Sequence, residues 1–404
     1  MNSLHSLSLQ EARHLHLAAQ GLLRAPAKRA VYQDLISCIS RMSLLQIDTI
    51  HVVARSPYLV LFSRLGNYPQ AWLEQALAQG ELFEYWAHEA CFIPRDDYRL
   101  LRHRMLSPER LGWKYNAQWV ADHQQAIAEL LQQIQENGPV RAADFTRADN
   151  PKSGWWDWKP HKRHLENLFS AGELMVAERR NFQRVYDLRS RVMPDWQDEM
   201  HGISEAEAIR QMLMNSARSL GIFRAAWLPD YYRLKRAPLT DFIADAQGAG
   251  DLVAVNTEGL GEMWLHRDYL PLLETPLQAT HSTVLSPFDP VVWDRKRALE
   301  LFNFDYRIEC YTPEEKRKFG YFVLPILHRD QIKGRLDARM LRQAKQLEIK
   351  KLWLEEKTRV TARFVVDIRR AIERFAAWQG AESVAILQAP DTLKDQWPAL
   401  WTLD

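Results

Sequence analysis

A short alternation of polar and apolar residues near the start of the chain could perform hydrolytic chemistry. Gln46 and Asp48 alternate with Leu45 and Ile47. In an extended chain the two polar side chains share one face, whereas on a regular helix residues two apart do not. A carboxylate that takes a proton or stabilises a cation, beside an amide that orients a water, is a minimal hydrolytic pair. Taken alone, the tetrapeptide favours a plainer interpretation, a half-buried edge strand whose polar side meets solvent.

The composition is that of an ordinary globular protein. The chain has 404 residues, of which 47% are hydrophobic and 26% charged, so two to four domains are expected. No apolar run of about 18 residues occurs, so no membrane span is predicted. The first residues are typical of a helix start and not of a signal peptide. Cys38, Cys91 and Cys310 are far apart, which favours a reducing cytoplasm and argues against a disulfide framework or zinc module.

One order of elements recurs along the chain. Apolar spacing predicts a helix over 29–42, a short extended segment over 44–48, and helices near 58–65 and 69–78. Two strand-like runs, 81–86 and 89–93, follow. Helix, strand, helix, helix and hairpin is the outline of a winged helix-turn-helix.

The same outline returns twice. The second copy would comprise a helix over 118–135, a short extended 140–142, a helix over 160–170, and strands 173–178 and 182–188 turning at 179–181. The third would start with a capping box at Ser204 and Glu207, continue through helices to 246, and end with strands 252–256 and 262–265. Because no sequence identity links the copies, the alternative is an unrelated α+β protein in which helices and hairpins alternate.

After about residue 278 the pattern changes to that of an antiparallel sheet or small barrel. Strands are predicted at 306–311, 321–327, 331–337 and 347–354, and one helix at 361–378. The predicted fold class is therefore α+β, mainly helical, with three tandem winged helix-turn-helix units followed by a C-terminal β-barrel-like domain. The expected boundaries are 1–115, 116–200, 201–277 and 278–404.

The net charge of +2 is close to neutral, so any affinity for a polyanion must come from clustered charge. Basic clusters fall at the predicted helix starts and wing turns, where winged helices meet phosphates. The predicted recognition helices at 69–79 and 238–246 contain no Lys or Arg, which favours grip on the DNA backbone over reading of base edges. The candidate DNA contacts are Arg55, Lys162, Arg163, Arg179, Arg180, Arg295, Lys296 and Arg297.

Other motifs are weaker. His161 and His164 share a helix spacing but have no third ligand at zinc spacing, so no metal is expected. The aromatic block 154–158, Gly-Trp-Trp-Asp-Trp, could stack on a base, although packing is the default for such a block. No phosphate-binding glycine loop or nucleophile elbow occurs, so no nucleotide cofactor is expected.

Five blocks resemble the winged-helix interstrand-crosslink DNA glycosylases, the AlkZ/AlkX group, and the resemblance spans nearly the whole chain. The blocks are Leu45-Gln-Ile-Asp-Thr-Ile-His-Val-Val-Ala-Arg-Ser-Pro-Tyr58, Tyr85-Trp-Ala-His-Glu-Ala-Cys-Phe-Ile-Pro94, Arg180-Asn-Phe-Gln-Arg-Val-Tyr-Asp-Leu188, Leu285-Ser-Pro-Phe-Asp-Pro-Val-Val-Trp-Asp-Arg-Lys-Arg297 and Tyr321-Phe-Val-Leu-Pro325.

The resemblance implies three tandem winged helices around a basic concave surface, and a β-barrel at the C-terminus. It also implies a catalytic motif of Gln, an aliphatic residue, then Gln or Asp, which Gln46 and Asp48 match in the aspartate form. The implied activity is that of a monofunctional glycosylase acting on N7-alkylguanine and on crosslinks in double-stranded DNA, with no cofactor. Asp48 would stabilise the sugar cation and activate water, and Gln46 would hold that water. Two alternatives stay open at this point, a winged-helix transcriptional regulator and a protein-interaction scaffold.

Overall fold

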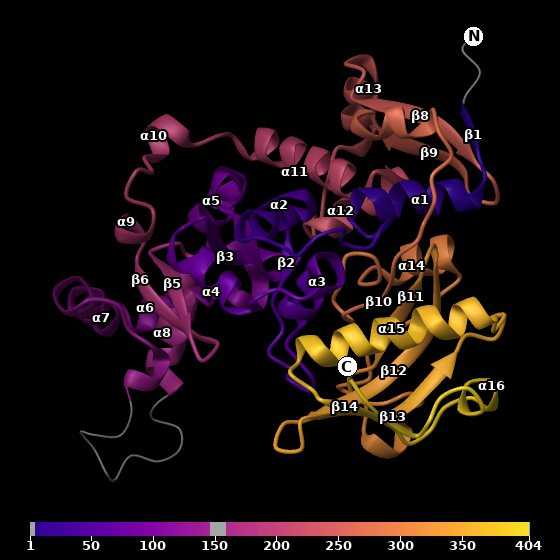
Figure 1. The fold of residues 1–404 in the computed structure, drawn as a ribbon. Coiled ribbons are helices and arrows are strands. Elements are labelled where there is room, and N and C mark those ends of the chain that lie inside the picture. Colours follow the sequence, from indigo (N-terminus) through magenta and orange to yellow (C-terminus); the bar gives the residue numbers. More distant parts are fainter. Residues whose placement is uncertain (1–4, 146–158, 404) are drawn as a thin grey trace. The chain divides into compact units, whose positions relative to one another are not determined.

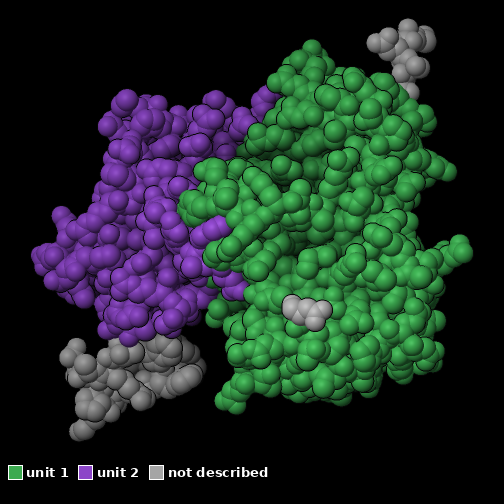
Figure 2. Space-filling model, viewed as in Figure 1, with its two compact units in different colours: residues 1–69, 213–404 green, residues 70–212 purple. Residues whose placement is uncertain are grey.

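The computed structural model describes residues 5–145 and 159–403, which form two compact units (Figure 2). Unit 1 comprises Met1–Pro69 and Leu213–Asp404, and unit 2 comprises Gln70–Met212. Unit 1 is therefore built from both ends of the chain. The four-domain division expected from the sequence stays a prediction.

In the N-terminal part of unit 1, a short strand precedes the helix start that the sequence predicts. Strand β1 (His5–Leu7) leads to helix α1 (Leu9–Ala19), where Ser8 and Glu11 form a capping box. Helix α2 (Tyr32–Met42), strand β2 (Leu45–Gln46) and helix α3 (Ser56–Leu65) follow in the predicted order.

The elements predicted for 204–265 are also present in order. Helix α11 (Glu205–Leu220) begins at Ser204, whose hydroxyl accepts a hydrogen bond from the Glu207 N–H at 3.2 Å. The remaining elements are β7 (Ile222–Phe223), a 3₁₀ turn at Ala225–Trp227, α12 (Leu228–Tyr231), α13 (Leu239–Gly248), β8 (Leu252–Thr257) and β9 (Gly261–His266). The short strand β7 pairs with β9, and β1 adds to the other side of β8, in the order β1-β8-β9-β7. Three tandem winged helices remain a prediction.

A curled sheet with one long helix across it forms the C-terminal part of unit 1 (Figure 1). Its strands, in spatial order, are β10 (Ser282–Val284), β11 (Leu324–His328), β12 (Gln331–Leu341), β13 (Gln346–Leu354), β14 (Ser383–Ile386) and β15 (Leu400–Thr402). Register shifts at Ile326/Leu327 and Asp337/Ala338 bend the strands, as β-bulges do. The sheet is a half-barrel with two open edges, which agrees with the barrel-like C-terminal domain expected from the sequence.

Helix α15 (Ala362–Trp378) packs on this half-barrel, as its apolar spacing predicts. It also contacts α3, since Phe62 stacks on Trp378 with ring centroids 4.6 Å apart. Two shorter helices, α14 (Arg295–Phe302) and α16 (Asp391–Lys394), complete the region. The strand predicted at 306–311 is wrong, because that segment has no regular structure and its first ring, Tyr306, is instead a buried anchor.

Unit 2 is a helical unit with two hairpins. Its elements are α4 (Ala71–Ala78), β3 (Leu82–Ala87), β4 (Glu89–Pro94), α5 (Tyr98–Leu106), α6 (Ala117–Asp122), α7 (Gln124–Asn137), α8 (Lys159–Ser170), β5 (Leu174–Arg180), β6 (Gln183–Leu188), α9 (Arg189–Val192) and α10 (Asp198–His201). The single helix predicted over 118–135 is broken at His123. The second hairpin turns at Asn181 and Phe182, both at positive φ, and Arg179 and Arg180 belong to its first strand.

A buried carboxylate joins the two hairpins of unit 2. Glu84 on β3 is fully buried and bonds to Arg179 at 2.8 Å and to Arg184, which come from β5 and β6. Burial acts to raise the pKa of Glu84, but the two guanidinium groups outweigh it and lower the pKa below its ordinary value.

The substitution Glu84→Gln should therefore destabilise unit 2. It leaves two guanidinium groups near each other without a counter-charge, an effect typically worth about 3–5 kcal/mol. Urea denaturation of the full chain measures it. The control is Glu178→Gln, which removes an exposed ion pair with Arg180 and should cost at most about 1 kcal/mol. Equal losses in the two variants would contradict the role of Glu84.

Candidate active site

A tight turn sets the direction of the chain just before the Gln46–Asp48 pair. Ser43 lies at φ +60°, and the Leu44 N–H donates to the Met42 carbonyl at 2.7 Å across it. This is a γ-turn of the strained kind, which is rare in a residue other than glycine. Two contacts hold it, because the Tyr231 hydroxyl donates to the same Met42 carbonyl at 2.7 Å and the Ser43 hydroxyl lies 3.2 Å from that of Ser219. The turn stops α2 and sends the chain into the core as β2.

The side chain of Gln46 is buried. The residue is only 7% exposed, so the interpretation of a strand whose polar side meets solvent is wrong at this position. Its Oε1 atom has no hydrogen-bond partner among the described residues. A buried amide oxygen without a donor costs about 1–3 kcal/mol, which is unusual enough to need an explanation. Such an atom is available to accept a hydrogen bond from a water or a substrate.

Asp48 is half-buried and fixed in place by its own backbone. Its Oδ1 accepts a hydrogen bond from the Ile50 N–H at 2.7 Å, a local turn that aspartate favours. Burial raises the pKa of Asp48, and the Ile50 hydrogen bond opposes that rise only in part. The carboxylate is therefore a stronger base than one in water. Regular strand structure ends at Gln46, so the extended conformation predicted through Asp48 is confirmed only for its first residues.

Two basic side chains, Arg55 and Arg342, lie near His51, three residues after Asp48. The Arg342 guanidinium, from the turn between β12 and β13, donates to the Val53 carbonyl at 3.0 Å and lies 3.4 Å from the His51 ring. Burial, Arg55 and Arg342 together lower the pKa of His51, so this ring is neutral near pH 7. The sequence offered no signal for Arg342, because it is a single arginine in a turn nearly 300 residues from the motif.

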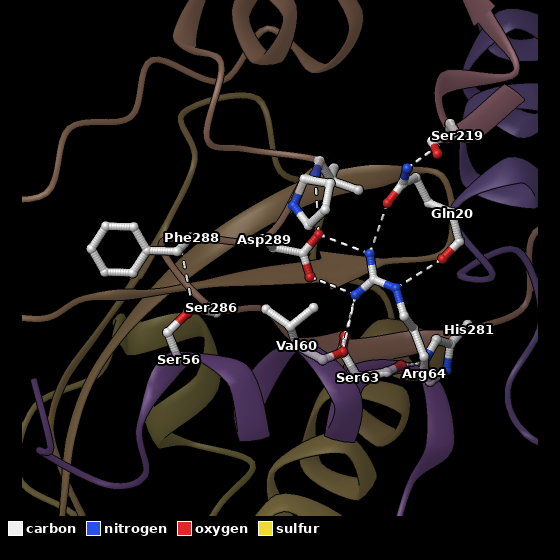
Figure 3. A network of polar contacts seen from close by, with 12 residues as sticks. Gln20, Ser56, Val60, Ser63, Arg64, Ser219, His281, Ser286, Phe288 and Asp289 are labelled. Atoms are coloured by element: carbon white, nitrogen blue, oxygen red, sulfur yellow. Dashed lines mark hydrogen bonds and ion pairs between the residues drawn. The ribbon is translucent and has the colours of Figure 1, made fainter. Parts of the chain in front are cut away.

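A buried ion pair anchors the helix that follows the motif (Figure 3). Arg64 on α3 bonds to Asp289 at 2.7 and 3.0 Å, and both side chains are almost completely buried. Arg64 also donates to the carbonyl and the side chain of Gln20, at 2.9 and 3.0 Å. Burial would lower the pKa of Arg64, but Asp289 raises it, so the pair is charged.

The same block of sequence makes a second contact with α3. The hydroxyls of Ser56, at the start of α3, and Ser286 lie 2.8 Å apart and are both buried (Figure 3). Residues 285–297 therefore tie α3 to the half-barrel from both ends of the helix. Ser286 and Asp289 thus hold α3, the helix that follows the Gln46–Asp48 motif in the chain.

In unit 1 the candidate DNA contacts fall into two groups. Arg295 and Lys296 are exposed in the first turn of α14, and Arg55 is half-buried at the start of α3. Arg297 is fully buried, where it donates to the Asp294 carboxylate and the Pro290 carbonyl. The prediction that Arg297 contacts DNA is corrected, because its charge is already used inside the fold.

Unit 2 divides the candidates in the same way. Lys162, Arg163 and Arg180 are exposed, and Arg163 lies over the Trp119 ring at 4.2 Å. Arg179 is buried on Glu84, so its assignment as a DNA contact is corrected as well. Adjacent residues on a strand point to opposite faces, so one of Arg179 and Arg180 had to face inward. The sequence did not show which of the two faces is buried.

The two histidines at helical spacing make contacts of other kinds. His161 stacks on Phe145 with centroids 4.6 Å apart, and His164 accepts a hydrogen bond from the Trp119 indole at 3.2 Å. Within residues 5–145 and 159–403, no three His, Cys, Asp or Glu side chains gather in a way that could hold a metal ion. The aromatic block 154–158 lies outside the described residues. No helix in the described parts of the chain is both long and apolar enough to cross a membrane.

The family of the chain is established by its sequence. A family model described as "DNA glycosylase AlkZ-like" matches residues 39–378, which include Gln46, Asp48 and the 285–297 block. The chain belongs to the AlkZ-like DNA glycosylase family. An enzyme class is thereby favoured over a transcriptional regulator or a scaffold.

A solved structure shares the fold. The chain is similar to the DNA glycosylase AlkZ of Streptomyces sahachiroi, with a TM-score of 0.62 and 14% sequence identity, over 95% of this chain and 100% of that one. The structural similarity therefore extends over both units, including the half-barrel of unit 1.

Proposed function

We propose that this protein is a monofunctional DNA glycosylase that hydrolyses the N-glycosidic bond of N7-alkylguanine, including guanines that crosslink two strands. Alkylation at N7 makes the base cationic and a good leaving group, so its departure needs no general acid. The bond to the sugar breaks with its electron pair leaving on the base, and positive charge develops on the sugar.

Asp48 and Gln46 supply what this reaction needs. The ionised Asp48 carboxylate stabilises the sugar cation and takes a proton from the attacking water, a role typically worth about 10²–10⁴-fold in rate. The Gln46 amide oxygen accepts a hydrogen bond from that water. The water oxygen forms the new bond at the sugar, which leaves an abasic site and the free base.

The proposal rests most on the environment of Asp48 and Gln46. A half-buried carboxylate of raised pKa and a buried amide oxygen without a donor stand two residues apart, in the part of the chain that the family model matches. Ordinary structural roles would leave the carboxylate hydrated and the amide satisfied. Helices α4 and α13 contain no Lys or Arg, which is consistent with a protein that grips DNA without reading sequence.

One assay tests the reaction. The protein is incubated with a duplex that carries a defined N7-guanine interstrand crosslink, and the strands are separated on a denaturing gel before and after alkaline cleavage of abasic sites. Unhooking, followed by cleavage only after alkali, is the expected result. Persistence of the crosslink and of N7-methylguanine in a companion duplex would overturn the proposal. Strand breaks before alkali would contradict the monofunctional assignment.

Charge reversal at Arg295 and Lys296 tests the grip on the backbone. If both contact phosphates, the double variant to Glu should weaken binding to unrelated sequences alike and lower the slope of log K against log salt by about 2. Fluorescence anisotropy at several salt concentrations measures both quantities. Lys394→Glu, at an exposed lysine on α16, is the matched control and should leave the slope unchanged. Loss on one sequence alone would contradict backbone contact.

A further inference from the structure

A rigid turn in unit 1 projects an aromatic ring. The Thr312 N–H donates to the Glu309 carbonyl at 2.9 Å, which closes a four-residue turn with Cys310 and Tyr311 at its centre. The Glu309 carboxylate accepts three backbone N–H groups, those of Lys318, Phe319 and Gly320, at 2.9, 2.8 and 3.0 Å. Burial acts to raise the pKa of Glu309, but these donors lower it below its ordinary value.

The base of the same loop is anchored in the half-barrel. The Tyr306 ring is buried against Phe304, with centroids 5.5 Å apart, and its hydroxyl donates to the Val323 carbonyl at 2.6 Å. Arg317 closes the far side by donating to the Thr312 carbonyl at 2.8 Å. The turn is therefore held by polar contacts on three sides, although it carries no strand.

Tyr311 stands at the tip of this turn and is 92% exposed, more than any other large apolar side chain among the described residues. A single exposed ring on a protein surface needs no explanation by itself. Here the ring is exposed at a point that a hydrogen-bonded frame keeps fixed. Such a ring can stack on a ligand without losing much conformational freedom.

The loop that carries the tip is packed onto the segment that follows Asp48. Phe322, at the end of the loop, lies 6.2 Å from Phe288 between ring centroids, and the neighbouring Ser286 hydroxyl lies 2.8 Å from that of Ser56. The charge of Asp48 acts on the tip itself. The Cys310 thiol, slight burial and the Asp48 carboxylate act together to raise the pKa of Tyr311, and burial followed by Asp48 raises the pKa of Cys310. Charges must be near each other to interact in this way. Tyr321 belongs to the same surface, and Arg317 lies over its ring at 5.1 Å.

We propose that the Tyr311 ring stacks on the alkylated guanine and holds its glycosidic bond against Asp48. An N7-alkylguanine carries a positive charge, and the face of an aromatic ring attracts cations as well as stacking on bases. The ring thus favours a cationic base over an undamaged one, and Tyr311 is a specificity-determining residue of the site. The inference rests on the proposed function and adds how the lesion is selected.

The test compares Tyr311→Ala with Tyr311→Phe. The alanine variant should release N7-methylguanine about 5- to 150-fold more slowly in single-turnover assays, which is the rate equivalent of the ~1–3 kcal/mol of a base–aromatic stack. The phenylalanine variant keeps the ring and should stay within about twofold of the wild type. Leu400→Ala removes an exposed apolar side chain on β15 and is the control for the loss of exposed apolar surface. It should leave the rate of base release unchanged.

A binding arm separates this inference from the proposed function. In an Asp48→Asn background, dissociation constants are measured for duplexes with N7-methylguanine and with guanine at the same position. Preference for the methylated duplex should be present with Tyr or Phe at 311 and lost with Ala. If the wild type releases no base, the proposed function fails. The inference about Tyr311 is then judged only by whether binding prefers the methylated duplex over the unmethylated one. Unchanged preference and rate in the alanine variant, or a phenylalanine variant as impaired as alanine, would overturn it.

Discussion

Asp48→Asn should release N7-methylguanine about 10²–10⁴-fold more slowly than the wild type, the range expected when a catalytic base is lost. Asparagine keeps the shape of the side chain and can still accept the hydrogen bond from the Ile50 N–H. DNA binding should therefore be retained. Single-turnover release of the methylated base from a duplex, measured by chromatography, reports the rate. Full activity in this variant would remove Asp48 from the mechanism.

The raised pKa of Asp48 adds a pH dependence to the same prediction. Burial favours the protonated form, so the wild-type rate should fall with decreasing pH at values above the ordinary aspartate range. The sign for stability is opposite to that for activity, because a carboxyl whose pKa is raised by folding destabilises the fold once it ionises. Asp48→Asn should accordingly be as stable as the wild type, or more stable, at neutral pH. A destabilised variant would mean that the carboxylate is structural.

The second large effect is expected at Asp289. Asp289→Asn leaves the Arg64 guanidinium buried without a counter-charge, which should lower the free energy of unfolding by about 3–5 kcal/mol. Denaturation of the full chain measures the loss. Asp391→Asn, which removes an exposed partner of Lys394, should change stability by at most about 1 kcal/mol.

A double variant distinguishes charge from packing in this network. Replacing the pair together, by Arg64→Met and Asp289→Leu, removes both charges and should recover much of the stability lost in Asp289→Asn. If the double variant is as unstable as the single one, the hydrogen bonds to Gln20 matter more than the ion pair.

Local patterns predicted most of the elements but not their partners. The helix start near Ser8, the N-cap at Ser204, the helical spacing before Trp378 and the hairpins of unit 2 were all predictable, because each depends on residues near one another in sequence. The strand predicted at 306–311 failed because its first aromatic residue, Tyr306, anchors a loop in the core. Alternation is the same for a strand and for an irregular segment with buried rings.

The candidate site could be suggested from the sequence, but its setting could not. The type and spacing of Gln46 and Asp48 allowed a hydrolytic pair or a plain edge strand, and the family resemblance favoured the pair, but the burial of Gln46 depends on contacts that the motif does not contain. The basic clusters near Arg179 and Arg297 looked alike in sequence, and only the burial of these two arginines against Glu84 and Asp294 separates them from their exposed neighbours. Long-range pairing of this kind leaves no local signal.

The discontinuous make-up of unit 1 has a consequence for how the enzyme matures on the ribosome. Arg64 meets Asp289 across 225 residues, so the Arg64 guanidinium has no buried counter-charge until the later segment has been made. At about 5–20 residues per second this interval lasts roughly 11–45 s. Unit 2 is complete before the anchor is, and it separates the two halves of unit 1 in time. The nascent chain therefore carries Gln46 and Asp48 long before the ion pair that holds the following helix can form.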